Sequence, residues 1–353
     1  MGVRTARRRA PATPIQHLIG VRDAHAWEAA LVGLPHLHAH GTAHARAMAA
    51  ASGNQVVLYV CEAVDGRIVC PVMLRPCADG FDLATPLGFA GFAGTGHVEG
   101  FAALWRDFWT ERDCVAAYVQ LNPLLDSALI DGPLATMASE ALPGNPVHLL
   151  DLRPDAEALF AGMGRDHRSR LRGWHRDGGR YVEEPDRLRE AFLNLYPAFA
   201  QRTGVSAAYR LDADSLALLL EADSVFLTGA EGADGAVEAV SLFTFTPYGA
   251  DYFLNAATPA GRRHARALVW RAIEWLKAAG VPCLNLGGGI RPDDALAQFK
   301  ARFGGEERPF LCFKQIFDKS RYARLCAAAG GASSSVDGYF PAYRGPATKG
   351  SPS

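Results

Sequence analysis

A lysine and two carboxylates lie within two helical turns of one another near the end of the sequence. Asp293, Asp294 and Lys300 follow a short apolar strand and three consecutive glycines, Gly287–Gly289. A lysine ammonium stabilises developing negative charge, and a neighbouring carboxylate can hold the lysine or receive a proton. The glycines allow backbone to approach a ligand or another strand closely, because no Cβ intervenes. The alternative is that Lys300 lies on a solvated helix face and the aspartates complement the helix dipole.

A second charged segment, residues 165–180, holds six arginines and two histidines against two aspartates. Arg165, Arg168 and Arg172 share one face of the helix expected there, because they are spaced i, i+3 and i+7. Arginine forks bind phosphate with two hydrogen bonds, which suits a nucleotide-linked acceptor, coenzyme A or a tRNA acceptor stem. We therefore expect these arginines to bind substrate. A solvated helix face is the alternative, and an RNA-binding module is a third interpretation that rests on this segment alone.

Three further side chains are candidates for lining a substrate pocket. Tyr252 and Asn255 lie on an apolar strand, where Tyr252 would act as a general acid or a stacking wall. Phe299 and Phe303 are spaced i and i+4, so they share a helix face and are expected in the core, with Phe299 at a pocket wall. For Tyr252 the alternative is an ordinary buried strand tyrosine.

Four histidines close together, His36, His38, His40 and His44, raise the question of a metal site. Three of them would share a helix face, but Gly41 interrupts the helix and no carboxylate or cysteine nearby completes a ligand set. We predict that no metal binds.

Composition excludes several broad classes. The 36 basic and 37 acidic residues leave no global field for nucleic acid or membrane. Seven scattered cysteines without a Cys-x-x-Cys pair favour reduced thiols and a cytoplasmic location. The arginine-rich start has no apolar segment behind it, and no run approaches the roughly 20 apolar residues of a membrane span. We expect residues 1–14 to be a disordered basic arm and residues 329–353 to be a disordered tail.

The same order of elements occurs twice along the chain: three strands, a helix and a strand. The turn residues between alternating apolar runs support hairpins. In the first half the expected elements are strands 55–61, 68–74 and 81–85, helix 98–110 and strand 115–121. In the second half they are strands 224–228, 237–245 and 251–255, helix 262–279 and strand 282–286.

Three motifs, in the right order, carry a family resemblance over residues 43–325. The block Phe299–Gly305 with the preceding glycines resembles the C-terminal signature of the Fem-type branch of GNAT acyltransferases. Residues 82–91 resemble the family stretch Asp-x-x-Thr-Pro-Tyr-Gly-Tyr-Gly-Gly, with Leu87 and Phe89 in place of the tyrosines. Residues 120–125 resemble Arg-Leu-x-Pro-Leu-Leu, with Gln120 in place of arginine. That branch includes peptidoglycan-bridge aminoacyltransferases and acetyltransferase proteins of polysaccharide gene clusters.

The resemblance implies an α/β (α+β) fold of two tandem GNAT-like domains, each a mixed, largely antiparallel sheet flanked by helices. The domains would span residues 15–146 and 147–328, with the signature in the second. By analogy, Lys300 would stand at the catalytic centre with Asp294 beside it, and Asn122 and Tyr209 would contact substrate.

The resemblance also shows that one expected element for binding the donor is incomplete. GNAT enzymes that use acetyl-CoA bind its pyrophosphate through a glycine-rich loop at the start of the central helix. Residues 258–265 occupy that position with one glycine, Gly261, so Arg262 and Arg263 would have to supply charge instead. The donor is therefore acyl-CoA or, as in the Fem branch, an aminoacyl-tRNA.

The sequence thus predicts an N-acyltransferase that acts on an amine of an amino sugar, nucleotide sugar or cell-envelope precursor. Transfer would be direct, because no Ser/His/Asp or Cys/His set for a covalent intermediate is evident. The alternative is a non-catalytic Fem-fold protein that recognises an envelope precursor.

Overall fold

The computed structural model describes residues 13–204, 210–289, 291, 293–330, 336 and 338–345. Thirteen strands form one twisted sheet, in which ten of the twelve pairings are antiparallel. Its order is β1-β2-β3-β4-β6-β13-β7-β12-β11-β10-β9-β8, and β5 pairs with β3 outside this path. The strands are β1 Ile15–Gly20, β2 Gln55–Glu62, β3 Gly66–Cys77, β4 Gly80–Ala84, β5 Ala93–Gly96, β6 Cys114–Gln120, β7 Leu142–Asp151, β8 Arg180–Val182, β9 Val225–Glu231, β10 Val237–Thr246, β11 Gly249–Ala257, β12 Cys283–Asn285 and β13 Glu306–Ile316.

Helices flank both halves of this sheet. The predicted helices at 98–110 and 262–279 are confirmed as α3 and α9, and the four strands expected in each half are also present, as β2, β3, β4 and β6 and as β9, β10, β11 and β12. None of the described helices is long and apolar enough to cross a bilayer. The helices are α1 Ala24–Leu31, α2 Thr42–Ser52, α3 Phe101–Thr110, α4 Asp126–Ile130, α5 Ala156–Gly162, α6 Arg165–Trp174, α7 Pro185–Thr203, α8 Ala213–Leu220, α9 Ala265–Ala278, α10 Ala295–Ala301 and α11 Lys319–Ala328, with 3₁₀ turns η1 His38–His40, η2 Ala135–Glu140, η4 Ala260–His264 and η5 Ala342–Arg344.

Apolar side chains form a separate core on each face of each half. In the first half, Tyr59 of β2 lies among Trp105, Phe108 and Trp109 of α3, with ring centroids 4.8–6.0 Å apart. In the second half, α9 covers one face of β10–β12 and the pair α7 and α8 covers the other. These layers cover both faces of the sheet in each half.

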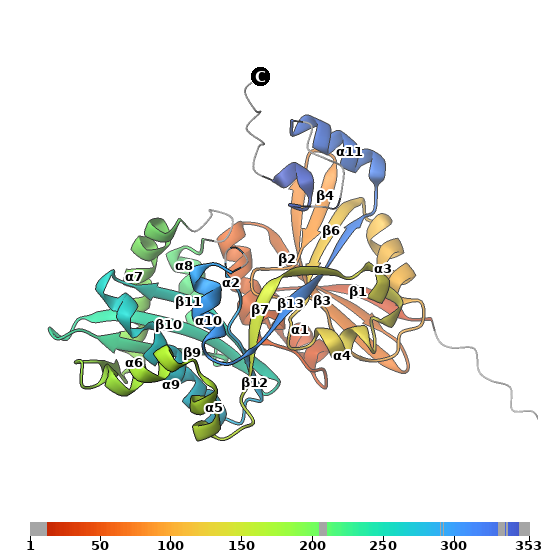
Figure 1. Cartoon of the computed structure of the whole chain (residues 1–353). Coiled ribbons are helices and arrows are strands. Elements are labelled where there is room, and N and C mark those ends of the chain that lie inside the picture. Colours follow the sequence, from red (N-terminus) through yellow and green to blue (C-terminus); the bar gives the residue numbers. More distant parts are fainter. Residues whose placement is uncertain are drawn as a thin grey trace, which may run out of the picture.

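The two halves are joined by strands rather than by a linker. β7 pairs with β12 of the second half and with β13, and β13 continues onto β6 of the first half. Figure 1 shows β13 running beside β7 between the teal strands β10 and β11 and the orange strands β4 and β6. The predicted domain boundary at residue 146 therefore falls inside β7, because this long strand serves both halves.

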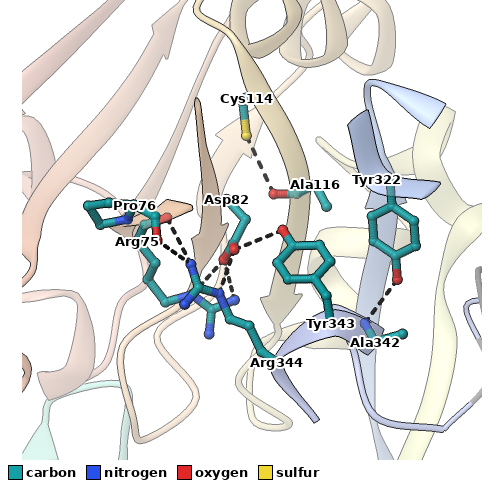
Figure 2. A network of polar contacts seen from close by, with 9 residues as sticks. All are labelled: Arg75, Pro76, Asp82, Cys114, Ala116, Tyr322, Ala342, Tyr343 and Arg344. Carbon is teal, nitrogen blue, oxygen red and sulfur yellow. Dashed lines mark hydrogen bonds and ion pairs between the residues drawn. The ribbon is translucent and has the colours of Figure 1, made fainter. Parts of the chain in front are cut away.

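The structure differs from the predicted disordered tail over residues 338–345, which pack on the first half of the chain. Asp82, fully buried, accepts hydrogen bonds from Tyr343 Oη at 2.9 Å and Arg344 Nε at 2.6 Å, and it is also paired with Arg75. Figure 2 shows both arginines converging on this one carboxylate. The Gly/Ser/Pro-rich composition suggested disorder, but a buried charge fixes these residues in place.

Candidate active site

Lys300 is buried beside the glycine turn. Asp294 caps the N-terminus of α10, since its carboxylate accepts from the backbone N–H groups of Leu296 at 3.0 Å and Ala297 at 2.8 Å. The short helix then presents Lys300, of which only 9% is exposed, and its Nζ donates to the carbonyl of Gly288 at 2.9 Å. The solvated-face alternative for this lysine is wrong.

Lys300 lies where two parallel strands separate. β11 and β12 share only the pairs Ala250↔Leu284 and Asp251↔Asn285. Beyond them β11 stays with β10, whereas the chain after β12 stays with β7, through bonds between Leu286 N and His148 O and between His148 N and Gly287 O. Parallel strands that part in this way expose backbone groups between them. The Lys300 ammonium, 5.8 Å from the ring centroid of Tyr252 on β11, is placed at this opening.

Two glycines of the turn are required by these contacts. Gly287 adopts a φ of 71°, and a Cβ added there would lie 2.9 Å from Lys300 Nζ. A Cβ on Gly288 would lie 2.1 Å from the carbonyl oxygen of Pro146. The three-glycine run therefore serves close packing between β7, the turn and the lysine.

Burial makes the charge of Lys300 conditional on pH. Desolvation lowers the pKa of Lys300 to about 8, and the nearby Asp294 carboxylate opposes that shift. The ammonium is present at neutral pH, where it can neutralise an oxyanion or a leaving anion. Asp294 thus has both roles suggested by the sequence, helix cap and electrostatic partner of the lysine.

A buried carboxyl at the base of the same opening was missed from the sequence. Asp251 accepts from Asn285 Nδ2 at 2.8 Å and from Asn122 Nδ2 at 3.3 Å. Burial raises the pKa of Asp251 to about 7 despite these two hydrogen bonds. Asn285 Oδ1 also accepts from Gly287 N at 2.8 Å, so it connects Asp251 to the glycine turn. The available signal was a lone aspartate in an apolar strand.

Asn122 belongs to this cluster, although it comes from the other half of the molecule. It follows β6, and its side chain reaches Asp251 of β11 across the junction. The substrate-binding role predicted for Asn122 stays a prediction. Its observed contact places it with the carboxyl rather than with the arginines of α6.

Tyr252 and Asn255 are linked through one serine. Ser241 Oγ donates to Asn255 Oδ1 at 3.3 Å and lies 3.5 Å from Tyr252 Oη. The Tyr252 ring stacks on Phe243 at 4.8 Å, and burial raises its pKa. Both side chains lie on the β11 side of the opening.

A histidine on α6 holds the helix that carries Lys300. Arg266 Nε donates to His167 Nδ1 at 3.2 Å, so Nε2 carries the proton and donates to the carbonyl of Phe299 at 3.1 Å. The His167 ring also contacts Phe299 and Phe303, with centroids 5.2 and 4.7 Å away. Phe299 is therefore half-buried beside the core that contains Phe303, and α6 fixes the position of α10.

The three arginines of α6 are not brought to Lys300. Arg165 and Arg172 are exposed, and Arg172 lies over the ring of Phe160 on α5 at 5.3 Å. Arg168 donates to the carbonyl of Ala161. These contacts point toward α5, and the predicted phosphate-binding role remains a prediction.

The turn before α9 does not fit a pyrophosphate held by backbone N–H groups. Gly261 N donates to Thr258 Oγ1 at 3.0 Å, and a Cβ on Gly261 would lie 2.0 Å from the carbonyl oxygen of Glu238. The Glu238 carboxylate in turn contacts His264 at 3.0 Å and Arg263 at 3.3 Å. An acidic side chain and a closed 3₁₀ turn thus occupy this position. Of the two arginines in the turn, Arg263 contacts Glu238, and Arg262 is exposed.

Tyr209 lies outside the described residues. His38, His40 and His44 are buried, and among the described residues no group of three or more histidine, cysteine, aspartate or glutamate side chains could hold a metal ion. His38 and His44 instead pack edge to face, 5.3 Å apart, with His38 Nδ1 2.7 Å from Ser224 Oγ.

A cleft of about 680 Å³ lies where β7, β12 and β13 meet α5. Both halves of the chain line it, and its walls carry carboxylates as well as guanidinium groups. The charged side chains are Asp151, Arg153, Glu306 and Arg308.

Comparison with solved structures identifies the arrangement. FemX superimposes with a TM-score of 0.63 at 12% identity, over 88% of this chain and 99% of FemX. The chain has the Fem-type, GNAT-like fold. The C-terminal domain of a putative lysylphosphatidylglycerol synthetase from Agrobacterium fabrum gives a TM-score of 0.54 at 17% identity, over 88% of this chain and 97% of that one. L-PGS from Bacillus licheniformis gives 0.52 at 12% identity, over 84% and 92%. No family model and no curated protein sequence matches the chain.

The Fem-type fold places the site in a known framework. The element order β9–β10–β11–α9–β12 is the GNAT core, and the separation of β11 from β12 lies at its centre. Identities of 12–17% show the fold alone. The chemistry has to be argued from Lys300, Asp251 and their surroundings.

Proposed function

We propose that the protein is an N-acyltransferase that moves an acyl group from acyl-CoA or an aminoacyl-tRNA to an amine. The acceptor amine would belong to an amino sugar, a nucleotide sugar or a cell-envelope precursor. The observation that carries the proposal is Lys300, a buried ammonium with a pKa near 8 at the point where β11 and β12 separate. The fold shared with FemX and the lysylphosphatidylglycerol synthetases supports it.

We propose a task for each residue of the site. Asp251, with a pKa of about 7, takes a proton from the acceptor ammonium near neutral pH. Lys300 stabilises the oxyanion of the tetrahedral intermediate or the leaving anion. Tyr252 forms the wall beside the lysine, and Asp294 fixes α10 and favours the charged form of Lys300.

The acceptor is proposed to lie in the cleft between the two halves. Glu306 would attract an ammonium group there, and Arg308, which also pairs with Asp126 at 2.9 Å, would suit phosphate. Asp151 and Arg153 pair with each other at 2.8 Å and together add both signs of charge to the wall. This mixture of charges matches an amine carried on a nucleotide-linked or phosphorylated molecule.

The closed turn around Gly261 bears on the donor. Because the turn η4 is closed against Glu238, acyl-CoA would have to bind through Arg262 and neighbouring side chains. The same observation favours the second candidate, a binding protein of this fold without turnover. An aminoacyl-tRNA donor does not require a pyrophosphate cradle.

Calorimetry with the full-length protein tests the donor. Acetyl-CoA and longer acyl-CoAs are titrated in turn, and charged tRNA is then titrated separately. Micromolar binding of a donor, followed by transfer to amino sugars, supports the proposal. Binding of an envelope precursor with no turnover from either donor supports the binding protein instead.

A further inference from the structure

The outer edge of β9 loses its neighbour partway along its length. β8 pairs with β9 through Arg180↔Glu231, Tyr181↔Ala230 and Val182↔Gly229. The chain then leaves the sheet, because α7 begins at Pro185. Residues 225–228 of β9 therefore pair with β10 alone among the described strands.

The hydrogen-bond pattern fixes which backbone groups face this open edge. Phe245 N donates to Ser224 O at 2.9 Å, so residue 224 turns its backbone groups toward β10. Antiparallel strands alternate, so residues 225, 227 and 229 turn theirs outward. Gly229 pairs there with Val182, whereas the N–H and C=O of Leu227 have no described partner. An occupant must therefore supply both a backbone acceptor and a backbone donor.

A cavity of about 330 Å³ lies along this edge between α7 and α9. Its α7 side is aliphatic, formed by Leu188, Leu220 and Leu227. On its α9 side Trp275, 42% exposed, stacks on Phe226 with centroids 4.2 Å apart. The two walls suit the two faces of an extended strand, whose side chains point alternately to each side.

The charged side chains of the cavity carry an excess of positive charge. Glu183, Arg189 and Arg271 line it. Arg271 Nη2 donates to both carboxylate oxygens of Glu183 at 3.2 Å, and among the described residues Arg189 has one ion-pair partner, the fully exposed Asp186, at 3.8 Å. Such exposed pairs are weak, so both guanidinium groups are available to a carboxylate.

We propose that this edge groove, formed by β9, α7 and α9, binds an extended acidic peptide segment of a partner protein as an added β-strand. The Leu227 backbone supplies the register, the aliphatic wall takes alternate apolar side chains, and Arg271 and Arg189 select acidic ones. The proposal is independent of the acyltransferase site, since no residue of that site lines the groove.

The first test uses a fluorescein-labelled octapeptide of alternating glutamate and leucine, titrated with full-length protein by fluorescence anisotropy. Saturable binding is expected. N-methylation of alternate backbone nitrogens, or replacement of glutamate by lysine, should weaken binding about tenfold. No saturation up to roughly 1 mM protein, or equal binding of the N-methylated peptide, overturns the proposal.

Variants of the protein locate the binding. Leu227→Pro removes the outward N–H at an edge position, where proline is tolerated, and the melting temperature checks its fold. Arg271→Gln removes the charge, and Arg180→Gln on β8, outside the groove, is its matched control. We expect Leu227→Pro and Arg271→Gln to bind the peptide about tenfold more weakly than the wild type. Arg180→Gln should bind it with unchanged affinity. Wild-type affinity in both Leu227→Pro and Arg271→Gln refutes the assignment.

A second copy of the chain is the competing occupant. Analytical ultracentrifugation at increasing concentration distinguishes it. Monomers support the peptide proposal, whereas dimers abolished by Leu227→Pro assign the edge to self-association and overturn it.

Discussion

Two buried ionisable side chains with opposite pKa shifts carry the proposed chemistry of the site. The pKa of Asp251 rises to about 7 and that of Lys300 falls to about 8, in both cases because burial penalises the charged form. A carboxylate and an ammonium then coexist only in a narrow range near neutral pH. That is the pairing required by a reaction that deprotonates an amine and neutralises an oxyanion.

The pH dependence of kcat/KM follows from this pair. Activity should rise as Asp251 loses its proton near pH 7 and should fall as Lys300 loses its own near pH 8. Initial rates between about pH 5.5 and 9.5 measure both limbs, because this range extends about 1.5 units beyond each pKa. Asp251→Asn should abolish the acid limb together with most of the activity. Lys300→Arg should shift the alkaline limb to higher pH. A kcat/KM of the wild type that does not change with pH would contradict the roles assigned to Asp251 and Lys300.

The sequence predicted Lys300 but missed Asp251, for a physical reason. Lys300 lies in a local motif of glycines, aspartates and phenylalanines, which one segment of sequence displays. Asp251 owes its raised pKa to burial, and its hydrogen-bond partners Asn285 and Asn122 lie 34 and 129 residues away in the chain. Burial and partners of that kind arise only from tertiary contacts.

At the scale of elements, the turn η4 and the helix α10 decide what the site can bind. The sequence correctly predicted that residues 258–265 depart from a pyrophosphate loop, since a single glycine is visible there. It did not predict that Gly261 packs against Glu238, because that contact depends on the register of β10 beside η4. Likewise, the clamp of His167 on α10 joins two helices that are distant in sequence.

Gly261→Ala tests the closed turn. A Cβ there would lie 2.0 Å from the Glu238 carbonyl oxygen, so either η4 or β10 must shift. We expect a loss of about 1–3 kcal/mol in the free energy of unfolding, measured by urea titration. Gly162→Ala is the matched control, because nothing lies within 4 Å of its added Cβ. Equal stability of the two variants would contradict the packing described for η4.

For the molecule as a whole, the repeated order of strands and helices could be predicted from the sequence. The pairing of strands that joins the two halves could not. The two passes of strands and helices follow from periodicity and turn residues, as β2–β3 and β10–β11 show. The insertion of β13 between β6 and β7 depends on long-range pairing, which no local pattern specifies. The packing of residues 338–345 also depends on a long-range contact. Their composition is typical of a disordered tail, but Arg344 donates a hydrogen bond to Asp82.

Arg344→Ala tests how much this C-terminal segment stabilises the first half. Asp82 would lose one guanidinium while it remains fully buried, which should cost about 1.5–3 kcal/mol in the free energy of unfolding. Arg324→Ala is the control, because Arg324 pairs with Asp79 at an exposed site, where solvent screens the pair and its loss should change stability little. Similar melting temperatures for both variants would show that the segment is dispensable.

Buried histidines should make the molecule sensitive to mild acid. Burial lowers the pKa of His40, His44 and His167 to about 4, from an ordinary value near 6.5. Between these values the unfolded chain binds more protons, so stability falls as pH falls, by up to about 3 kcal/mol for each histidine. Urea midpoints from pH 7 to pH 4 measure the slope, which should be shallower in His44→Gln. A constant midpoint across this window would contradict the neutral, buried state of these rings.

The most direct test of the central claim is transfer of a radiolabelled acyl group to a panel of amine acceptors by the wild type and Lys300→Ala. Both acyl-CoA and aminoacyl-tRNA serve as donors, and Lys319→Ala, an exposed lysine on α11, is the control. The account predicts turnover by the wild type and the control, and a loss of about a hundredfold or more in Lys300→Ala with its fold intact. Equal rates in Lys300→Ala and the wild type, or no transfer from either donor, would contradict it.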